Sequence, residues 1–246
     1  IAGLFRAGRL VRHVPEAVIN GFTIGIAIII ATSQIPDLLG LAGPFPADFL
    51  EKIPALIRAL PGLNPASLAI GAVTIVLIMA LRRAFPRLPG LIVAVALSSA
   101  IVQLFDLPVE TIQSRFGALP QQLPRPQLPD LSLSSLRELL PSALVIAFLA
   151  GVESLLSAMV ADRMIGGKHR SNAELMAQGW ANIGSSLFGG LPATGAIART
   201  ATNVRAGGKT PVAGIVHALT LLAIMMLAAP LAGYLALPAL SGLLLL

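Results

Sequence analysis

Residues 189–203 read GGLPATGAIARTATN, and they separate two strongly apolar stretches of the chain. The two opening glycines and Pro192 argue against a continuous helix, because glycine pairs and proline interrupt helices. Thr194 is a good helix N-cap, so a short helix is predicted over residues 195–204. That helix would carry a full positive charge, Arg199. The stretch therefore predicts an extended piece and a short helix between two hydrophobic segments.

The composition predicts that the surroundings are a bilayer. The 246 residues are 56% hydrophobic and 11% charged, and the mean hydropathy is +0.86. Soluble domains carry about 25% charged residues, so this chain cannot cover its surface with charge. Its formal net charge of +6 would be compatible with nucleic-acid binding. However, the basic residues form short clusters between apolar runs, and only 4% of residues are aromatic. Nucleic-acid binding is therefore not expected.

Apolar runs that approach or reach the roughly 20 residues needed to cross a membrane recur along the chain. The predicted membrane segments are residues 14–41, 67–81, 88–107, 141–164, the shorter and more polar 172–188, 210–229, and the start of another at 231–246. These runs predict an all-α polytopic membrane protein.

Two longer connections lie between these segments. Residues 42–63 include the amphipathic piece ADFLEKIPALIRAL, which is expected at the membrane interface. Residues 108–138 are rich in Pro and Gln, with a short helix predicted over residues 131–140. Neither connection resembles a soluble domain.

The basic residues orient the segments. Eleven Lys and Arg side chains fall on one predicted side, five on the other, and Arg199 lies between them. The eleven are Arg6, Arg9, Arg12, Arg82, Arg83, Arg87, Arg163, Lys168, Arg170, Arg205 and Lys209. The positive-inside rule places that side in the cytoplasm. Residues 189–205 must then count as one crossing, which a broken element supported by neighbouring protein allows. The expected location is the cytoplasmic (inner) membrane.

Two ionisable residues, Glu153 and Arg199, are predicted at membrane depth. An ionised side chain at a helix centre costs roughly 2.5–3.5 kcal/mol on insertion scales, so each is a candidate functional residue. The alternative is a structural Glu–Arg pair that joins two helices. Ser157 lies four residues after Glu153 and shares its helix face, so the two residues predict a proton or Na⁺ site. For the hydroxyls of Ser154 and Ser157, ordinary bonding to helix carbonyls is the alternative.

The predicted helix start before Arg199 has the chemistry of an anion site. The first N–H groups of a helix have no intrahelical partner, and the helix dipole adds roughly half a positive charge there. Broken helices whose N-termini meet at the bilayer midplane are a recurring transporter device. The alternative is a loop near the interface with a snorkelling arginine.

Neither metal-ligand spacing nor an enzyme motif occurs in the sequence. The three histidines, His13, His169 and His217, are scattered, and there is no cysteine. The patterns H-E-x-x-H, G-x-S-x-G and the P-loop are also missing. No resident cofactor or enzyme activity is therefore expected.

Two stretches of the chain resemble the sulfate permease (SulP) family of anion transporters. The first is VPEAVINGFTIGIAIIIATSQIPDLLG, residues 14–40. The second, residues 152–214, is more specific, because NAELMAQGWANIGSSLFGG is followed by the helix start T-G-x-x-x-R. The resemblance covers nearly the whole chain.

The resemblance implies a fold of fourteen membrane segments in two inverted repeats of seven, divided into a core and a gate domain. Residues 1–138 would finish the first repeat, from the end of segment four through segment seven. Residues 139–246 would hold segments eight to eleven and the start of segment twelve. The chain starts without Met and stops inside the apolar run SGLLLL, so a fragment of a longer bacterial protein is expected. Expected partners are the bilayer, the remaining segments, a C-terminal STAS domain and a second copy.

The resemblance also implies the roles of individual residues. Substrate in the family binds between the facing N-termini of half-helices three and ten, and segment ten maps onto residues 194–204. The implied substrate-site residues are Thr194, Gly195, Ala196, Ile197, Ala198 and Arg199. Segment eight carries a carboxylate in many coupled members, and that position maps onto Glu153, with Ser157 nearby. Half-helix three lies outside this sequence.

These observations predict a secondary active transporter that moves sulfate, bicarbonate or a dicarboxylate together with protons. Four alternatives remain open: an uncoupled exchanger or channel, a Na⁺-coupled symporter, a nucleobase carrier, and a membrane scaffold without transport. Glu153 argues against an uncoupled path, and Arg199 argues against a nucleobase. A scaffold would show no saturable anion uptake.

Overall fold

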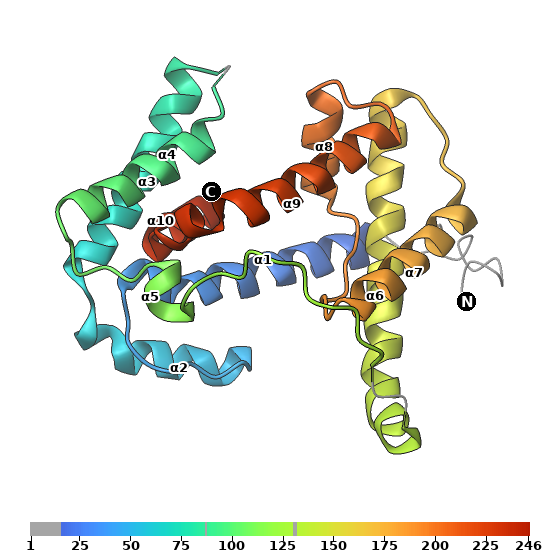
Figure 1. The fold of residues 1–246 in the computed structure, drawn as a ribbon, viewed down its shortest axis with the longest axis horizontal. Coiled ribbons are helices and arrows are strands. Elements are labelled where there is room, and N and C mark those ends of the chain that lie inside the picture. The colour runs from blue at the N-terminus through green and yellow to red at the C-terminus, as the bar shows by residue number, and fades with distance from the viewer. Residues whose placement is uncertain (1–15, 87, 130–131) are drawn as a thin grey trace. The chain divides into compact units, whose positions relative to one another are not determined.

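The computed structural model describes residues 16–86, 88–129 and 132–246, and the described chain is helical (Figure 1). The N-terminal basic cluster, His13 and the first two residues of the predicted first segment lie outside these ranges. The α-helices are α1 (Glu16–Leu39), α2 (Phe49–Ala59), α3 (Pro65–Ala84), α4 (Gly90–Leu104), α5 (Ile112–Phe116), α6 (Leu133–Ile165), α7 (Ser171–Leu187), α8 (Ile197–Arg205), α9 (Pro211–Gly233) and α10 (Leu237–Leu244). A single 3₁₀ turn, η2 (Leu60–Gly62), follows α2.

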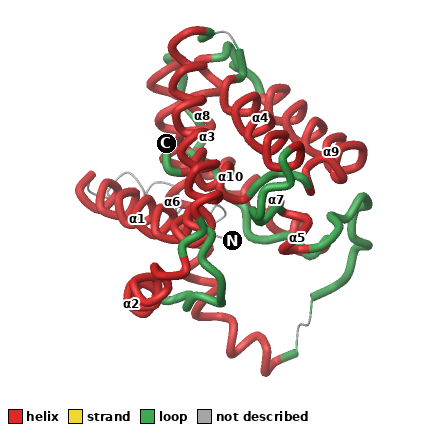
Figure 2. The backbone as a smooth tube through the Cα atoms, turned by 90° about the vertical axis from the view of Figure 1, so that its left-hand side faces the viewer, coloured by secondary structure: helices red, strands yellow, loops and turns green. Residues whose placement is uncertain are grey.

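The composition of the helices confirms the membrane class. Within the described ranges, α3, α6 and α9 are long and apolar enough to cross a membrane. Two shorter apolar helices, Thr23–Leu39 within α1 and Gly90–Leu104, accompany them. No strand occurs in the part of the chain that the structure describes (Figure 2). The protein is therefore an all-α polytopic membrane protein, as the hydropathy predicts.

Contacts divide the chain into two compact units. The first, called here the α6–α8 unit, includes residues 122–222, and the second, the α3–α10 unit, includes residues 17–121 and 223–246. The predicted repeat boundary between residues 138 and 139 falls inside α6. That boundary concerns repeats rather than packing, and it remains a prediction.

Helices α3, α4 and α10 pack closely because small residues face one another. A Cβ on Gly242 would lie 2.9 Å from the carbonyl oxygen of Gly71, so the two backbones approach at this point. Beside them, the buried hydroxyls of Thr74 and Ser98 share a hydrogen bond of 2.7 Å. The buried apolar core consists of Ile70, Val95, Val102, Ala236 and Ala239. Each of these three helices therefore packs one of its faces against the other two.

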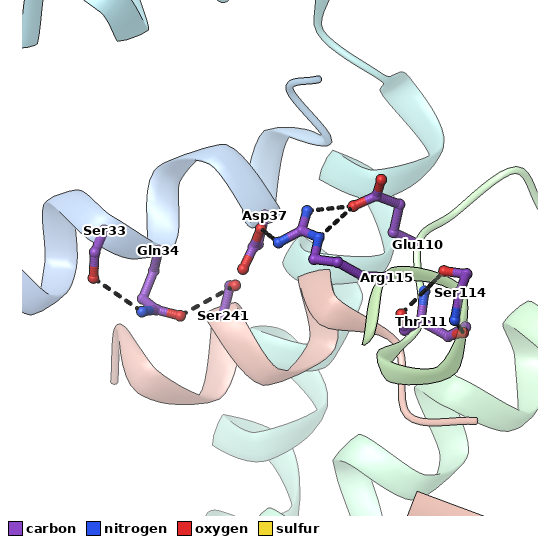
Figure 3. Close-up of polar contacts among 8 residues, drawn as sticks. All are labelled: Ser33, Gln34, Asp37, Glu110, Thr111, Ser114, Arg115 and Ser241. Carbon is purple, nitrogen blue, oxygen red and sulfur yellow. Dashed lines mark hydrogen bonds and ion pairs between the residues drawn. The ribbon is translucent and has the colours of Figure 1, made fainter. Parts of the chain in front are cut away.

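One end of the α3–α10 unit is held by an arginine (Figure 3). Arg115 pairs with Asp37 of α1 and with Glu110, whose Oε2 accepts from Arg115 Nε at 2.9 Å. Burial acts to lower the pKa of Arg115, but its hydrogen bonds and charge pairing with Asp37 and Glu110 raise that pKa above the ordinary value. The backbone of Leu237 donates to the Glu110 carbonyl, so this loop also reaches α10. Arg115 therefore links α5 to α1, next to the hydrogen bond between Leu237 and Glu110.

We expect replacement of Arg115 by alanine to destabilise the α3–α10 unit by up to about 1 kcal/mol. The variant leaves the carboxylates of Asp37 and Glu110 together without their cation, and ion pairs as exposed as these contribute about 0.2–1 kcal/mol. Thermal unfolding of the full-length protein in detergent measures the effect. The control is Arg58→Ala in the same unit, because Arg58 is exposed and has no ion pair with the described residues. Equal unfolding temperatures for the two variants would show that the ion pairs of Arg115 do not stabilise the unit.

Two of the predicted helix boundaries lie next to prolines, and both are wrong. The helix predicted over 131–140 does not end before Pro141, because α6 continues from Leu133 to Ile165. Helix α9 likewise passes through Pro230 and ends at Gly233. In membrane helices, neighbouring groups satisfy the backbone that proline frees, so the long apolar run decides the outcome.

Candidate functional site

The chain breaks between α7 and α8, as the opening stretch predicts. Helix α7 ends at Leu187, α8 begins at Ile197, and residues 188–196 are not helical (Figure 1). Gly189 has φ +67°, a left-handed conformation that glycine adopts without a Cβ clash. The prediction of an extended piece followed by a short helix is confirmed. Its placement at the bilayer midplane remains a prediction.

Thr194 does not cap the short helix, and this corrects the sequence prediction. Its hydroxyl donates to the carbonyl of Ala150 at 2.9 Å and lies 3.1 Å from Ser154 Oγ. The backbone N–H of Gly195 donates to the same Ser154 oxygen at 3.1 Å. Because Thr194 gives its proton to Ala150, Ser154 donates to Thr194 and accepts from Gly195. Thr194 therefore fastens the chain to α6, and α8 begins two residues later than predicted.

Gly195 permits the close approach between this segment and α6. A Cβ at this position would lie 3.2 Å from Ser154 Cα and 3.3 Å from Ser157 Cβ. Both distances are tighter than ordinary van der Waals contact, so only glycine fits without movement. The small side chains of Ser154 and Ser157 supply the other half of the contact. The backbone of Gly195 is therefore seated directly on the Ser-rich face of α6.

The start of α8 has free backbone donors. Ala196 occupies the N-cap position, and no side chain in the described part of the chain caps the helix. The N–H groups of the first turn, in residues 197–199, consequently have no intrahelical partner. The Gly195 N–H is already used by Ser154. Of the predicted substrate-site residues, Ile197, Ala198 and Arg199 thus present free amides, whereas Thr194 and Gly195 are bound to α6.

Arg199 projects from the first turn of α8 without a partner. It is exposed, and it makes no hydrogen bond or ion pair with the described residues. A pair between Glu153 and Arg199, the structural alternative raised by the sequence, is not among the ion pairs of the described chain. Arg199 therefore adds an uncompensated positive charge to the free amides.

Ser157 carries a buried hydroxyl with unused hydrogen-bonding capacity. Its side-chain oxygen has no partner among the described residues, and the residue is 4% exposed. A buried polar group without a partner costs about 1–3 kcal/mol. The alternative of bonding to helix carbonyls is wrong for Ser154, which bonds across to residues 194 and 195, and Ser157 makes no such bond. Glu153, four residues earlier, is partly buried on α6. The predicted coupling residues thus lie on the face of α6 that meets Gly195.

The connection from α6 to α7 is ordered by a separate polar cluster. Asp162 Oδ2 accepts from the His169 backbone N–H at 2.9 Å and lies 2.7 Å from His169 Nδ1, while Ser171 Oγ lies 3.0 Å from Nε2. This cluster closes the end of α6 against the start of α7. Within the ranges described, no group of His, Cys, Asp and Glu side chains has the geometry of a metal site.

Known proteins are similar to this chain over nearly its whole length. The profile of the sulfate permease family matches residues 1–246. A putative sulfate transporter, YvdB of Bacillus subtilis (strain 168), is 41% identical over 244 residues, which is 98% of this chain and 46% of the relative. The bicarbonate transporter BicA of Synechocystis sp. is 33% identical over 243 residues, 98% of this chain and 42% of the relative. The chain thus spans less than half the length of these relatives, which are transporters and not enzymes.

Solved structures agree with these sequence matches. The transmembrane domain of a cyanobacterial bicarbonate transporter BicA superposes with a TM-score of 0.87 at 31% identity, covering 99% of this chain and 62% of that one. The structure of SLC26A9 superposes with a TM-score of 0.82 at 22% identity, covering 94% of this chain and 38% of that one, and supports the fold alone. The helices therefore form part of the seven-plus-seven inverted-repeat transporter fold. The chain belongs to the sulfate permease family.

Proposed function

We propose that this chain is part of a secondary active transporter that carries a small anion by alternating access. The observation that supports the proposal is the uncapped start of α8 with unpaired Arg199 in its first turn. Free N–H groups, the positive end of the helix dipole and a guanidinium favour an anion at one place. Backbone amides recognise charge more than identity, so sulfate, bicarbonate and dicarboxylates are all proposed as substrates.

Protons are the proposed coupling ion, with Glu153 as the carrier. A carboxyl that takes up a proton offsets the charge of the anion carried beside it, which lowers the cost of moving the loaded site through the membrane. A second candidate, Na⁺ coupling, is favoured by the unpartnered Ser157 hydroxyl. Hard cations prefer oxygen ligands, and Glu153 and Ser157 offer carboxylate and hydroxyl oxygens on one helix face.

We propose further parts of the same protein as partners of this site. The chain covers 62% of the BicA transmembrane domain, which supports a site completed by segments outside these residues, half-helix three in particular. A C-terminal STAS domain, a homodimer and insertion in the inner membrane belong to the same proposal. The basic clusters around residues 163–170 and 205–209 support the membrane orientation.

Uptake into vesicles by the full-length protein tests the transport function. We expect saturable, concentrative uptake that is driven by an inward proton gradient, with labelled sulfate and bicarbonate assayed separately. Competition by sulfate, bicarbonate, chloride and dicarboxylates then ranks the substrates. A membrane scaffold predicts no saturable uptake, a nucleobase carrier predicts competition by uracil rather than by anions, and an uncoupled exchanger or channel predicts no accumulation against a gradient.

A further inference from the structure

The extended segment before α8 is held by one polar face of α7. Gln178, Asn182 and Ser185 follow one another at intervals of four and three residues, so they share a helix face. Each of the three side chains donates a hydrogen bond to a backbone carbonyl in residues 191–193. Because these bonds go to the backbone, they fix the path of the segment whatever its side chains are.

Asn182 makes the most specific of these contacts. Its Nδ2 donates to the Ala193 carbonyl at 2.9 Å, and its Oδ1 accepts from the Ala193 N–H at 2.7 Å. One amide therefore satisfies both polar backbone groups of a single residue, as a neighbouring β-strand would. The second proton of Nδ2 bonds the Gln178 carbonyl at 3.0 Å, which holds the amide in place. Gln178 also donates to the Ala193 carbonyl, and Asn182 adds the bond to the Ala193 N–H that fixes the orientation of this residue.

Ser185 holds the same segment nearer its beginning. Its hydroxyl donates to the Leu191 carbonyl at 3.1 Å, and its own carbonyl accepts from the Gly190 N–H at 2.9 Å. A Cβ on Gly190 would lie 2.3 Å from Ser185 Oγ, so the segment passes this point with no room to spare. The residues that follow Gly190 are thus guided along α7 from their start.

The contacts on α7 and α6 meet at consecutive residues. Ala193 is fixed by α7, and Thr194 and Gly195 are fixed by α6. Helix α8 begins two residues later, at Ile197. We propose that Asn182 is a positioning residue for the anion site at the start of α8. The proposal rests on the function proposed above, and Asn182 acts on the site through Ala193 rather than by touching substrate.

Loss of the Asn182 contact changes affinity more than folding. The bonds from α6, from Ser185 and from Gln178 to the Ala193 carbonyl still hold the segment near its place, so the fold persists. The free N–H groups of α8 lose their fixed direction, so they bind the anion less tightly. We therefore expect the apparent KM for the anion to rise in Asn182→Ala by about 10- to 100-fold, because two hydrogen bonds to Ala193 are lost and each contributes about 3- to 10-fold.

The experiment compares variants of neighbouring residues on α7 in the full-length protein. Initial uptake of labelled sulfate, and separately of labelled bicarbonate, is measured against concentration in proteoliposomes. Ser185→Ala loses one hydrogen bond, so its KM is expected to rise by about 3- to 10-fold. Ser186→Ala is the matched control, because among the described residues the Ser186 hydroxyl bonds only within α7, to the Ile183 carbonyl at 2.9 Å. Its KM is expected to equal that of the wild type.

Asn182→Asp separates positioning from general damage to the fold. Aspartate keeps the size of the side chain and the acceptor for the Ala193 N–H, but its second oxygen would face the carbonyls of Ala193 and Gln178, so its KM is expected to rise at least as far as that of the alanine variant. A folded Asn182 variant with wild-type KM and only a lower maximal rate would overturn the proposal. If neither Asn182 variant folds, an unchanged KM in Ser185→Ala overturns it. Absence of saturable uptake in the wild type instead refutes the transport function.

Discussion

Replacing Arg199 with alanine is expected to raise the apparent KM for the transported anion by about 10- to 100-fold without abolishing transport. At an effective dielectric near 20, a charge about 4 Å from the anion contributes roughly 4 kcal/mol, and desolvation removes part of that. Arg199 has no partner among the described residues, so its charge is not spent on another group. The N–H groups of the first α8 turn remain in the variant, which is why some binding persists.

Concentration-dependent uptake by Arg199→Ala and two companions measures this effect. Arg205→Ala removes an exposed charge from the last turn of the same helix, where no anion site is proposed, and is expected to keep the wild-type KM. Arg199→Lys keeps the charge, so its KM is expected to lie between those of Arg199→Ala and the wild type. If Arg199→Ala shows the wild-type KM, the arginine serves the structure and the anion is held elsewhere.

Replacing Glu153 with glutamine is expected to abolish the stimulation of uptake by external acid. Glutamine is neutral like the protonated carboxyl, so the variant can still bind an anion but cannot take up and release a proton. The measurement is vesicle uptake at fixed internal pH while the external pH is stepped from alkaline to acid. The wild type should respond to the step, and the variant should transport at a rate that is independent of it.

The same assay decides between the two coupling ions. If Glu153→Gln keeps the wild-type pH response, Glu153 is not the proton site. If a Na⁺ gradient drives uptake in place of the pH gradient, the site is a cation site, and Ser157→Ala should then weaken the dependence on Na⁺. Under proton coupling, Ser157→Ala should leave the pH response in place. The unpartnered oxygen of Ser157 makes this comparison informative.

Much of the fold follows from patterns that the sequence carries locally. Apolar runs placed the membrane helices, and the glycines with Pro192 placed the break before α8. The boundaries predicted at Pro141 and Pro230 were wrong, because a helix within a long apolar run continues through a proline that would usually end it. The capping role of Thr194 failed for a different reason. Its hydroxyl bonds to Ala150 on α6, 44 residues earlier, and no local pattern announces such a partner.

The sequence predicted which residues belong to the candidate site. It did not predict the hydrogen bonds that hold the segment before α8. Glu153, Ser157 and the start of α8 follow from residue type, spacing and the family resemblance, and their roles remain predictions. The two hydrogen bonds between Asn182 and Ala193 were not predicted, although the motif NAELMAQGWANIGSSLFGG contains Asn182. A signal was present, because the spacing of Gln178, Asn182 and Ser185 places three polar groups on one face of α7. Periodicity reveals such a face, but only three-dimensional packing shows that it binds backbone rather than solvent.

The backbone character of the contacts around residues 190–195 has a consequence for evolution. Side chains of α7 hold carbonyl and amide groups, and the exposed amides of α8 are themselves backbone. Mutations at Leu191, whose side chain is 84% exposed, or at Ala198, which is also exposed, can therefore accumulate without dismantling the support. Under the proposed function, changes in the side chains around these amides would alter which anion is preferred, while the backbone contacts that hold the segment stay the same.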